Sequence, residues 1–212
     1  VLKNQGEGFY YLKHIHYLHC YAELGRQQEA DKLIVNIGEK LKNITPFNVF
    51  FPVMTIPYYG IVEEWDKMND MIDKLSPLVE SYGINFLSIF LHDGRGDFYQ
   101  KYKEYDKAIE SYNKSLAMSS AYTWNTLVQL GKVYRKKEDY KMAEKTFIKA
   151  IKQIDVNAEL YYEYAILKEE VGELDESKIY IEKAYNLYKN ADKQVKLAQK
   201  IWEKHQQLTM QQ

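Results

Sequence analysis

The stretch that decides the fold is Leu130-Gly131-Lys132-Val133-Tyr134, followed a few residues later by Ala143-Glu144-Lys145-Thr146-Phe147 and then by Ala150. In both segments apolar residues recur at intervals of three and four, which is the spacing of an amphipathic helix. The polar residues 136–139 lie between the segments, as expected for a turn. The stretch therefore predicts a helical hairpin in which Gly131 and Ala143 let the two helices approach closely.

The same pattern recurs on both sides of this hairpin. Gly96 and Gly131 are 35 residues apart, and a further shift of 34 residues from Gly131 leads to Ala165. The matched sets are Gly96, Tyr99, Tyr105, Ala108, Tyr112 and Leu116; Gly131, Tyr134, Tyr140, Ala143, Phe147 and Ile151; and Ala165, Leu174, Ser177, Ile181, Ala184 and Tyr185. A repeated pair of amphipathic helices predicts an array of stacked units rather than a single globular core.

These residues resemble the tetratricopeptide repeat family, whose 34-residue period carries a Leu-Gly-x-x-Tyr and an Ala-x-x-x-Phe pattern. The resemblance is strong over about 89–191, moderate over 11–44 and weak over 49–82, where Met68 replaces the small residue. It implies an all-α fold, a right-handed superhelical α-solenoid of about five helical hairpins. The expected units are about 11–44, 49–82 (degenerate), 89–122, 124–157 and 158–191.

A single amphipathic helix is expected over 192–208, after the last unit. Its apolar side carries Val195, Ala198, Ile201 and Trp202, and its polar side carries Lys193, Lys196, Lys200 and Lys204. Such a helix covers the apolar face of a terminal repeat and turns a polar face to water. We therefore expect one array with a C-terminal cap over 1–212. Because the chain begins at Val1 without an initiator methionine, we also expect it to be a piece of a larger protein.

The stretch from Asn43 to Val62 contains no charged residue and approaches the length that crosses a bilayer. Pro46, Pro52 and Pro57 each remove a backbone donor, which a spanning helix in lipid does not tolerate well. We therefore interpret the stretch as a buried, kinked helix of the array and expect no membrane insertion by this segment.

The composition excludes several classes of partner and site. The 212 residues carry a formal net charge of -1, which gives no global attraction to nucleic acid. The single cysteine, Cys20, excludes an intramolecular disulfide and a multi-cysteine zinc cluster. It leaves the reducing cytoplasm as the default compartment, and we expect a cytoplasmic location.

No motif for catalysis is apparent. His14, His16 and His19 lie beside Cys20, but no carboxylate or further histidine with zinc-ligand spacing accompanies them. The sequence shows no activated nucleophile and no glycine-rich phosphate loop, and the tripeptide Arg95-Gly96-Asp97 falls within a predicted helix. We expect no catalytic residue, no cofactor and no metal, so the chain is predicted not to be an enzyme.

The resemblance identifies the residues that would contact a ligand, because in this family the first helix of each pair lines a concave groove. The corresponding positions are His16, His19, Asp93, Asp97, Asn125, Gln129, Lys132, Arg135, Glu159, Tyr162 and Glu163. One branch of the family binds the terminal carboxylate of chaperones through Lys and Asn in this groove. Here Asp93, Asp97, Gln129, Glu159 and Glu163 occupy that region, and their charge would repel a carboxylate.

We therefore expect a protein or peptide partner, with a basic segment that meets Glu159, Glu163, Glu169 and Glu170, and not a chaperone C-terminus. The predicted role is a scaffold or adaptor module. Two alternatives stay open at this point. One is the peptide-sensing domain of a transcriptional regulator, and the other is an accessory domain of a larger enzyme or membrane protein.

Overall fold

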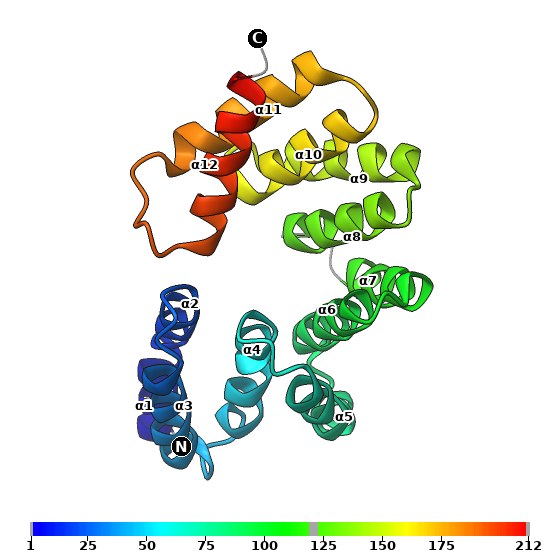
Figure 1. Ribbon diagram of the computed structural model, residues 1–212. Helices are drawn as coiled ribbons and strands as arrows, with labels where there is room; N and C mark the ends of the chain where they lie inside the picture. Colours follow the sequence, from blue (N-terminus) through cyan, green and yellow to red (C-terminus); the bar gives the residue numbers. More distant parts are fainter. Residues whose placement is uncertain (1, 119–122, 211–212) are drawn as a thin grey trace. The chain divides into compact units, whose positions relative to one another are not determined.

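A computed structural model describes residues 2–118 and 123–210 of the chain. The described residues form α-helices and contain no β-strand (Figure 1). In chain order the helices are α1 (Leu2–Leu12), α2 (Ile15–Glu23), α3 (Gln27–Leu41), α4 (Phe47–Ile61), α5 (Trp65–Tyr82), α6 (Asn85–Lys101), α7 (Tyr105–Met118), α8 (Trp124–Lys136), α9 (Tyr140–Gln153), α10 (Ala158–Glu170), α11 (Leu174–Tyr188) and α12 (Lys196–Thr209). The predicted all-α repeat fold is confirmed.

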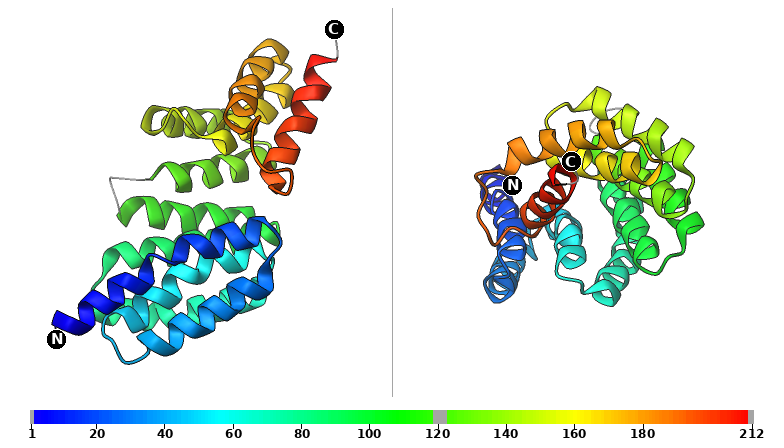
Figure 2. Two further views of the ribbon diagram at one scale, coloured as in Figure 1. Left: turned by 90° about the vertical axis from the view of Figure 1, so that its left-hand side faces the viewer. Right: turned by 45° about the horizontal axis from the view of Figure 1, so that its top comes forward.

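The chain divides into two compact units. The first comprises residues 1–103 and 113–118, and the second comprises residues 104–112 and 119–212, so α7 contributes to both. In the first unit α4 packs against α2, α3, α5 and α6. In the second unit α8 packs on α9, α10 on α8, α9 and α11, and α12 on α11 (Figure 2). Each unit is therefore built from helical hairpins that stack on their neighbours in sequence.

The turn inside each hairpin contains one residue in the left-handed backbone conformation. These residues are Gly25, Glu63, Lys103, Glu138 and Gly172, with φ between 61° and 82°. After Gly25, Glu63, Glu138 and Gly172, the next amide donates to a carbonyl five residues back, as Asp139 N does to Tyr134 O at 2.9 Å. This bond ends the first helix and reverses the chain. The predicted turn at 136–139 is confirmed.

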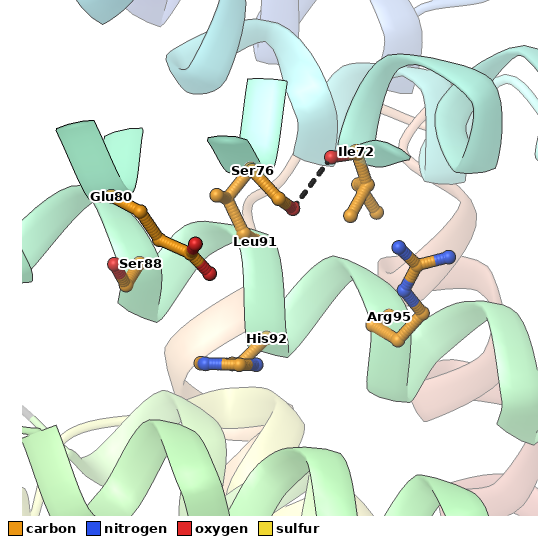
Figure 3. Close-up of a pocket in the computed structure, with 7 residues that line it drawn as sticks. All are labelled: Ile72, Ser76, Glu80, Ser88, Leu91, His92 and Arg95. Carbon is orange, nitrogen blue, oxygen red and sulfur yellow. Dashed lines mark hydrogen bonds between the residues drawn. The ribbon is translucent and has the colours of Figure 1, made fainter. Parts of the chain in front are cut away.

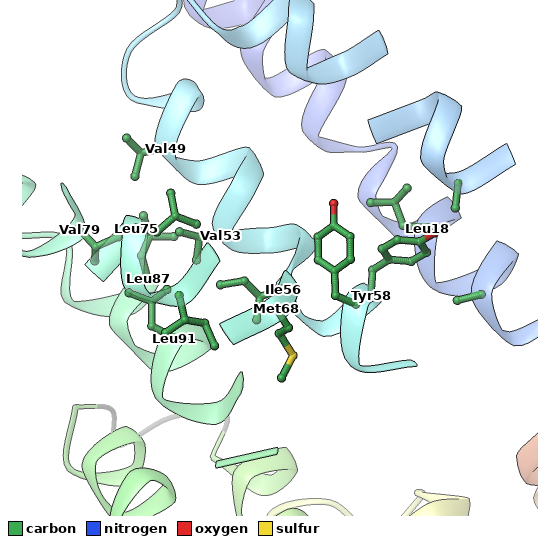
Figure 4. Packing of buried hydrophobic residues seen from close by; sticks show 14 residues of the cluster. Leu18, Val49, Val53, Ile56, Tyr58, Met68, Leu75, Val79, Leu87 and Leu91 are labelled. Carbon is green, nitrogen blue, oxygen red and sulfur yellow. The ribbon is translucent and has the colours of Figure 1, made fainter. Parts of the chain in front are cut away.

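The core of the first unit forms around α4, the helix without charged residues. Val53 and Ile56 of α4 are fully buried, together with Met68 and Ile72 of α5 and Leu87 of α6 (Figure 4). Met68 replaces the small residue of the repeat, and a Cβ on Gly60 would lie 3.6 Å from its sulfur, an ordinary van der Waals contact. The larger residue at Met68 therefore fills the core beside α4 without a clash.

Prolines do not break α4. The helix continues from Phe47 to Ile61 through Pro52 and Pro57, and the Thr55 hydroxyl donates to the carbonyl of Pro52 at 2.7 Å. The interpretation of this stretch as a buried helix is confirmed. In the described residues no helix has both the length and the apolar composition that a membrane span requires.

The second unit packs as the repeat pattern predicts. Ala143 and Phe147 are fully buried, and a Cβ on Gly131 would lie 2.5 Å from the Phe147 ring. Gly131 therefore provides the close contact between α8 and α9, because any larger residue would displace the ring.

The C-terminal helix begins later than the sequence suggests. Ile201 and Leu208 are fully buried against α10 and α11, as expected for a cap. However, α12 begins at Lys196 rather than at Asp192. The Asp192 carboxylate accepts a hydrogen bond from the Gln194 amide at 2.9 Å, and Val195 has an extended backbone. This local bond competes with helix formation over the first expected turn.

The sequence analysis did not predict α1. Gly6 and Gly8 weaken the helical signal of this segment. A Cβ on Gly8 would lie 2.2 Å from the Phe47 ring, so the close packing of α1 on Phe47 requires a glycine at this position.

Candidate functional site

The predicted ligand-contact residues lie on the first helices of the hairpins, in both units. In the first unit His16 and His19 are exposed on α2, and Asp93 and Asp97 are partly buried on α6. Asp93 and Asp97 each interact with other residues of the chain. In the second unit Asn125, Gln129, Lys132 and Arg135 lie on α8, and Glu159, Tyr162 and Glu163 lie on α10.

The structure brings the charged residues of α8 and α10 into direct contact. Glu159 accepts hydrogen bonds from Gln129 at 3.2 Å and from Lys132 at 2.9 Å. Arg135 donates to Glu163 at 2.8 Å and to Glu170 at 2.6 Å. The acidic and basic residues therefore neutralise each other along the surface that the two helices share.

Arg135 and Glu163 are the most buried members of this network, with 13% and 11% of their side chains exposed. Burial opposes the charge of the guanidinium, but the carboxylates of Glu163 and Glu170 outweigh it and raise the pKa of Arg135 above its ordinary value. The Arg135 guanidinium donates to Glu170 through one nitrogen and to Glu163 through another, and these two bonds fix the alignment of α8 against α10.

Helix α12 extends the network to a third helix. The Lys204 ammonium group donates to Glu169 of α10 at 2.9 Å. All four glutamates that were expected to meet a basic ligand, Glu159, Glu163, Glu169 and Glu170, are therefore paired within the chain. A basic ligand at this surface remains a prediction, and its cations would have to compete with these internal partners.

Tyr162 differs from its predicted neighbours because it packs against the core of the second unit. Burial, and then the charge of Glu163, raise the pKa of its phenol. Its ring contributes to packing at least as much as to the surface.

The sequence analysis assigned no contact residue to the degenerate unit, but the structure shows an apolar helix face there. Phe50, Met54, Pro57 and Ile61 recur on α4 at intervals of four and three, so they share one face of the helix. Pro57 is exposed and the other three are partly buried, whereas most other side chains of α4 are buried. The arc of α4 that reaches solvent is therefore apolar, and Phe50 and Ile61 on it also pack against the core of the first unit.

Helix α6 continues this apolar surface. The Phe86 ring is 49% exposed and makes an edge contact with the Phe50 ring, with 5.4 Å between ring centroids. Phe90 lies one turn further along the same face of α6 and is partly buried. We call Phe50, Met54, Pro57, Phe86 and Phe90 the α4–α6 apolar face. The signal that could have found it is the uncharged stretch itself, which contains too many apolar residues for one core-facing stripe.

A shallow pocket lies between α5 and α6 in the first unit (Figure 3). Its lining residues are Ile72, Ser76, Glu80, Ser88, Leu91, His92 and Arg95. Burial, with help from Lys114 and Arg95, lowers the pKa of His92. The volume of the pocket, about 100 Å³, is well below the roughly 300–1,000 Å³ of pockets that hold ligands or cofactors.

The histidines at the N-terminus do not form a metal site in the part of the chain that the structure describes. No group of three or more His, Cys, Asp or Glu side chains there is arranged to hold a metal ion. Cys20 is a free, exposed cysteine.

Comparison with known proteins places the repeat in a family. A model of the tetratricopeptide repeat matches residues 93–122 and 125–154. No curated protein matches the chain in sequence. The two matched segments correspond to α6–α7 and α8–α9, the hairpins in which the repeat pattern is clearest.

Solved structures of low sequence identity share the fold. A chain of the APC/C hetero-tetramer Cut9–Hcn1 is 14% identical, with a TM-score of 0.72 over 91% of this chain and 35% of that chain. PilW, a type IV pilus biogenesis factor, is 14% identical, with a TM-score of 0.65 over 95% of this chain and 93% of its own. A tetratricopeptide repeat protein from Parabacteroides merdae is 17% identical, with a TM-score of 0.56 over 94% of this chain and 72% of its own. Two segments of the chain thus match the tetratricopeptide repeat, and its helical hairpins share the fold of these solved structures.

Proposed function

We propose that this chain is a non-catalytic module that binds a partner protein, and that the α4–α6 apolar face is its principal contact surface. The repeat fold suggests a scaffold for protein–protein interaction. The observation that carries the proposal is the apolar composition of the solvent-facing arc of α4. An exposed helix face in a soluble array is normally polar, and a contiguous apolar face indicates an interaction site.

The chemistry of this face defines its ligand. Phe50, Phe86 and Phe90 supply aromatic surface, Met54 supplies a flexible thioether, and Pro57 lacks a backbone donor. Aromatic residues and methionine are enriched in protein interfaces, where they pack around large apolar side chains of the partner. We expect the partner to present an aliphatic or aromatic anchor at this face.

The charged surface of the second unit has a different role in this proposal. Because Lys132, Arg135, Glu159 and Glu163 pair with each other, they hold α8 and α10 together and leave little uncompensated charge for a ligand. A basic ligand segment at Glu159 and Glu163 would be secondary to the apolar anchor. The sensory and accessory roles, and a cytoplasmic location, stay predictions, since each is compatible with the same binding face.

A selection from a display library of random short peptides tests the proposal. The wild-type chain should enrich peptides that contain aromatic or large aliphatic residues. A double variant, Met54→Asp with Phe86→Asp, should lose binding of these peptides while it keeps its helical circular dichroism. Leu78→Asp is the matched control, because Leu78 is 46% exposed on α5, outside the face. Equal binding to wild type and double variant would refute the proposal.

A further inference from the structure

A row of lysines lies on α9, outside the surfaces described above. Lys141, Lys145, Lys149 and Lys152 are all exposed, and Ile148 between them is 38% exposed. At 3.6 residues per turn these five side chains fall within an arc of about 100°, and the lysines extend along about 17 Å of the helix. We call them the α9 lysine stripe.

The stripe carries uncompensated positive charge. Within the described residues none of its four ammonium groups has a carboxylate partner. The one acidic residue of α9 is Glu144, which lies about 40° outside the arc. Glu144 binds Lys168 of α10 at 2.6 Å, and the Lys168 side chain is only 5% exposed. Within the described residues the stripe therefore has no ion-pair partner of its own.

The repeat does not require lysines at three of these four positions. One repeat earlier, on α7, the residues that match Lys141, Lys145 and Lys152 are Asp106, Glu110 and Ala117. One repeat later, on α11, they are Asp175, Ile179 and Asn186, whereas the site of Lys149 is a lysine in all three repeats. Helix packing is thus maintained without lysine at three of the sites, so the fold alone does not account for a complete row.

The stripe is bordered by acidic residues on one side. Lys168 binds Glu144 of α9, Glu173 at 2.5 Å and Glu176 at 3.0 Å. Glu173 precedes α11 and Glu176 lies in its first turn. Three carboxylates around one cation leave net negative charge beside the stripe. A flat anionic surface such as a lipid bilayer, or a broad polyanion such as a nucleic-acid duplex, would meet this repulsion.

We infer that the α9 lysine stripe is a docking surface for an acidic helical segment of a partner protein. The stripe is one helix wide, and its lysines recur at intervals of four and three residues, which matches carboxylates at the same spacing on a second helix. Ile148 supplies an apolar contact at its centre. The surface is separate from the α4–α6 apolar face and does not depend on the function proposed for that face.

Fluorescence anisotropy with a designed peptide tests this inference. The probe is an alanine-rich helical peptide with glutamates at positions i, i+4, i+8 and i+11, compared with a peptide of equal composition whose glutamates surround the helix. The wild-type chain should bind the first peptide more tightly, and added salt should weaken the binding. Replacing Lys141, Lys145, Lys149 and Lys152 by Gln should lower the affinity by about tenfold or more, because four exposed ion pairs are removed.

A charge-matched control separates the stripe from general electrostatics. Lys189, Lys193, Lys196 and Lys200 are exposed elsewhere in the second unit, and their replacement by Gln removes the same charge. This control should bind the peptide within about twofold of wild type. The inference is overturned if both quadruple variants lose affinity equally, or if neither does. It is also overturned if phosphatidylserine vesicles or duplex DNA bind through the stripe while the peptide does not.

Discussion

The guanidinium group of Arg135 on α8 donates to the Glu163 carboxylate on α10 at 2.8 Å, and both side chains are almost fully buried. Two consecutive hairpins of the second unit are thus joined by an ion pair rather than by apolar contacts alone. Arg135 and Glu163 were predicted to contact a ligand, but in this chain they hold neighbouring repeats together.

Removing the negative charge of Glu163 should destabilise the second unit. In Glu163→Gln the buried guanidinium keeps Glu170 as its only carboxylate, so we expect a loss of about 1–3 kcal/mol in the free energy of unfolding. Glu170→Gln, at the more exposed end of the same cation, should cost within about 1 kcal/mol. Urea unfolding followed by circular dichroism checks both values. Equal losses would show that the burial of the carboxylate does not determine how much stability its removal costs.

Enlarging the small residue of the repeat should overpack the hairpin. Ala143 has no exposed surface, so Ala143→Leu should lower the free energy of unfolding by about 1–3 kcal/mol. Ala117→Leu places the same side chain on an exposed site of α7 and should change it by less than about 0.5 kcal/mol. Thermal unfolding distinguishes them, and an unchanged melting temperature for Ala143→Leu would contradict the packing assignment.

The left-handed turn residues allow a two-way test. Glu138 has φ of 63°, a backbone conformation that is higher in free energy for a residue with a Cβ than for glycine. Glu138→Gly should therefore stabilise the chain by up to about 1 kcal/mol. Gly172 has φ of 82° and no atom within 4 Å of an added Cβ, so Gly172→Ala should destabilise by about 1 kcal/mol through the backbone alone. Differential scanning calorimetry should show melting temperatures that shift in opposite directions.

Alkaline pH should weaken the second unit through Tyr164. Burial, opposed by Lys168, raises the pKa of this phenol from 10 to about 12. Because the pKa is higher in the folded chain than in the unfolded chain, the stabilisation is complete below pH 10 and is lost as the pH rises toward 12. Tyr164→Phe should therefore lose less stability than wild type between pH 9 and pH 12, as measured by urea unfolding. A parallel decline in the two proteins would contradict this assignment.

The fold could be predicted from sequence wherever one residue type is required by close packing. Gly131 lies against the Phe147 ring and Ala143 is fully buried, so small residues recur there and the repeat is visible in the sequence. The helix α4 could also be predicted, because its apolar, uncharged composition indicates a buried element, and Pro52 and Pro57 are accommodated within it. The start of α12 could not, because a single side-chain bond from Asp192 decides it.

The candidate surfaces were less predictable than the fold. The sequence places Lys132, Arg135, Glu159 and Glu163 on first helices, but it does not show that they bind each other across hairpins. The α4–α6 apolar face was missed because its α4 residues lie on the degenerate unit, where the family pattern offers no positions to transfer. Only the contact between Phe50 and Phe86 shows that the two helices share one apolar surface.

The most direct test of partner binding at this face is NMR of the chain labelled at the methionine methyl groups. Met54 belongs to the α4–α6 apolar face, whereas Met142 lies on α9 of the second unit and Met210 is exposed after α12. On addition of a peptide selected by the wild-type chain, the Met54 methyl resonance should shift, while those of Met142 and Met210 should not. A shift at Met142 with no change at Met54 would contradict the account.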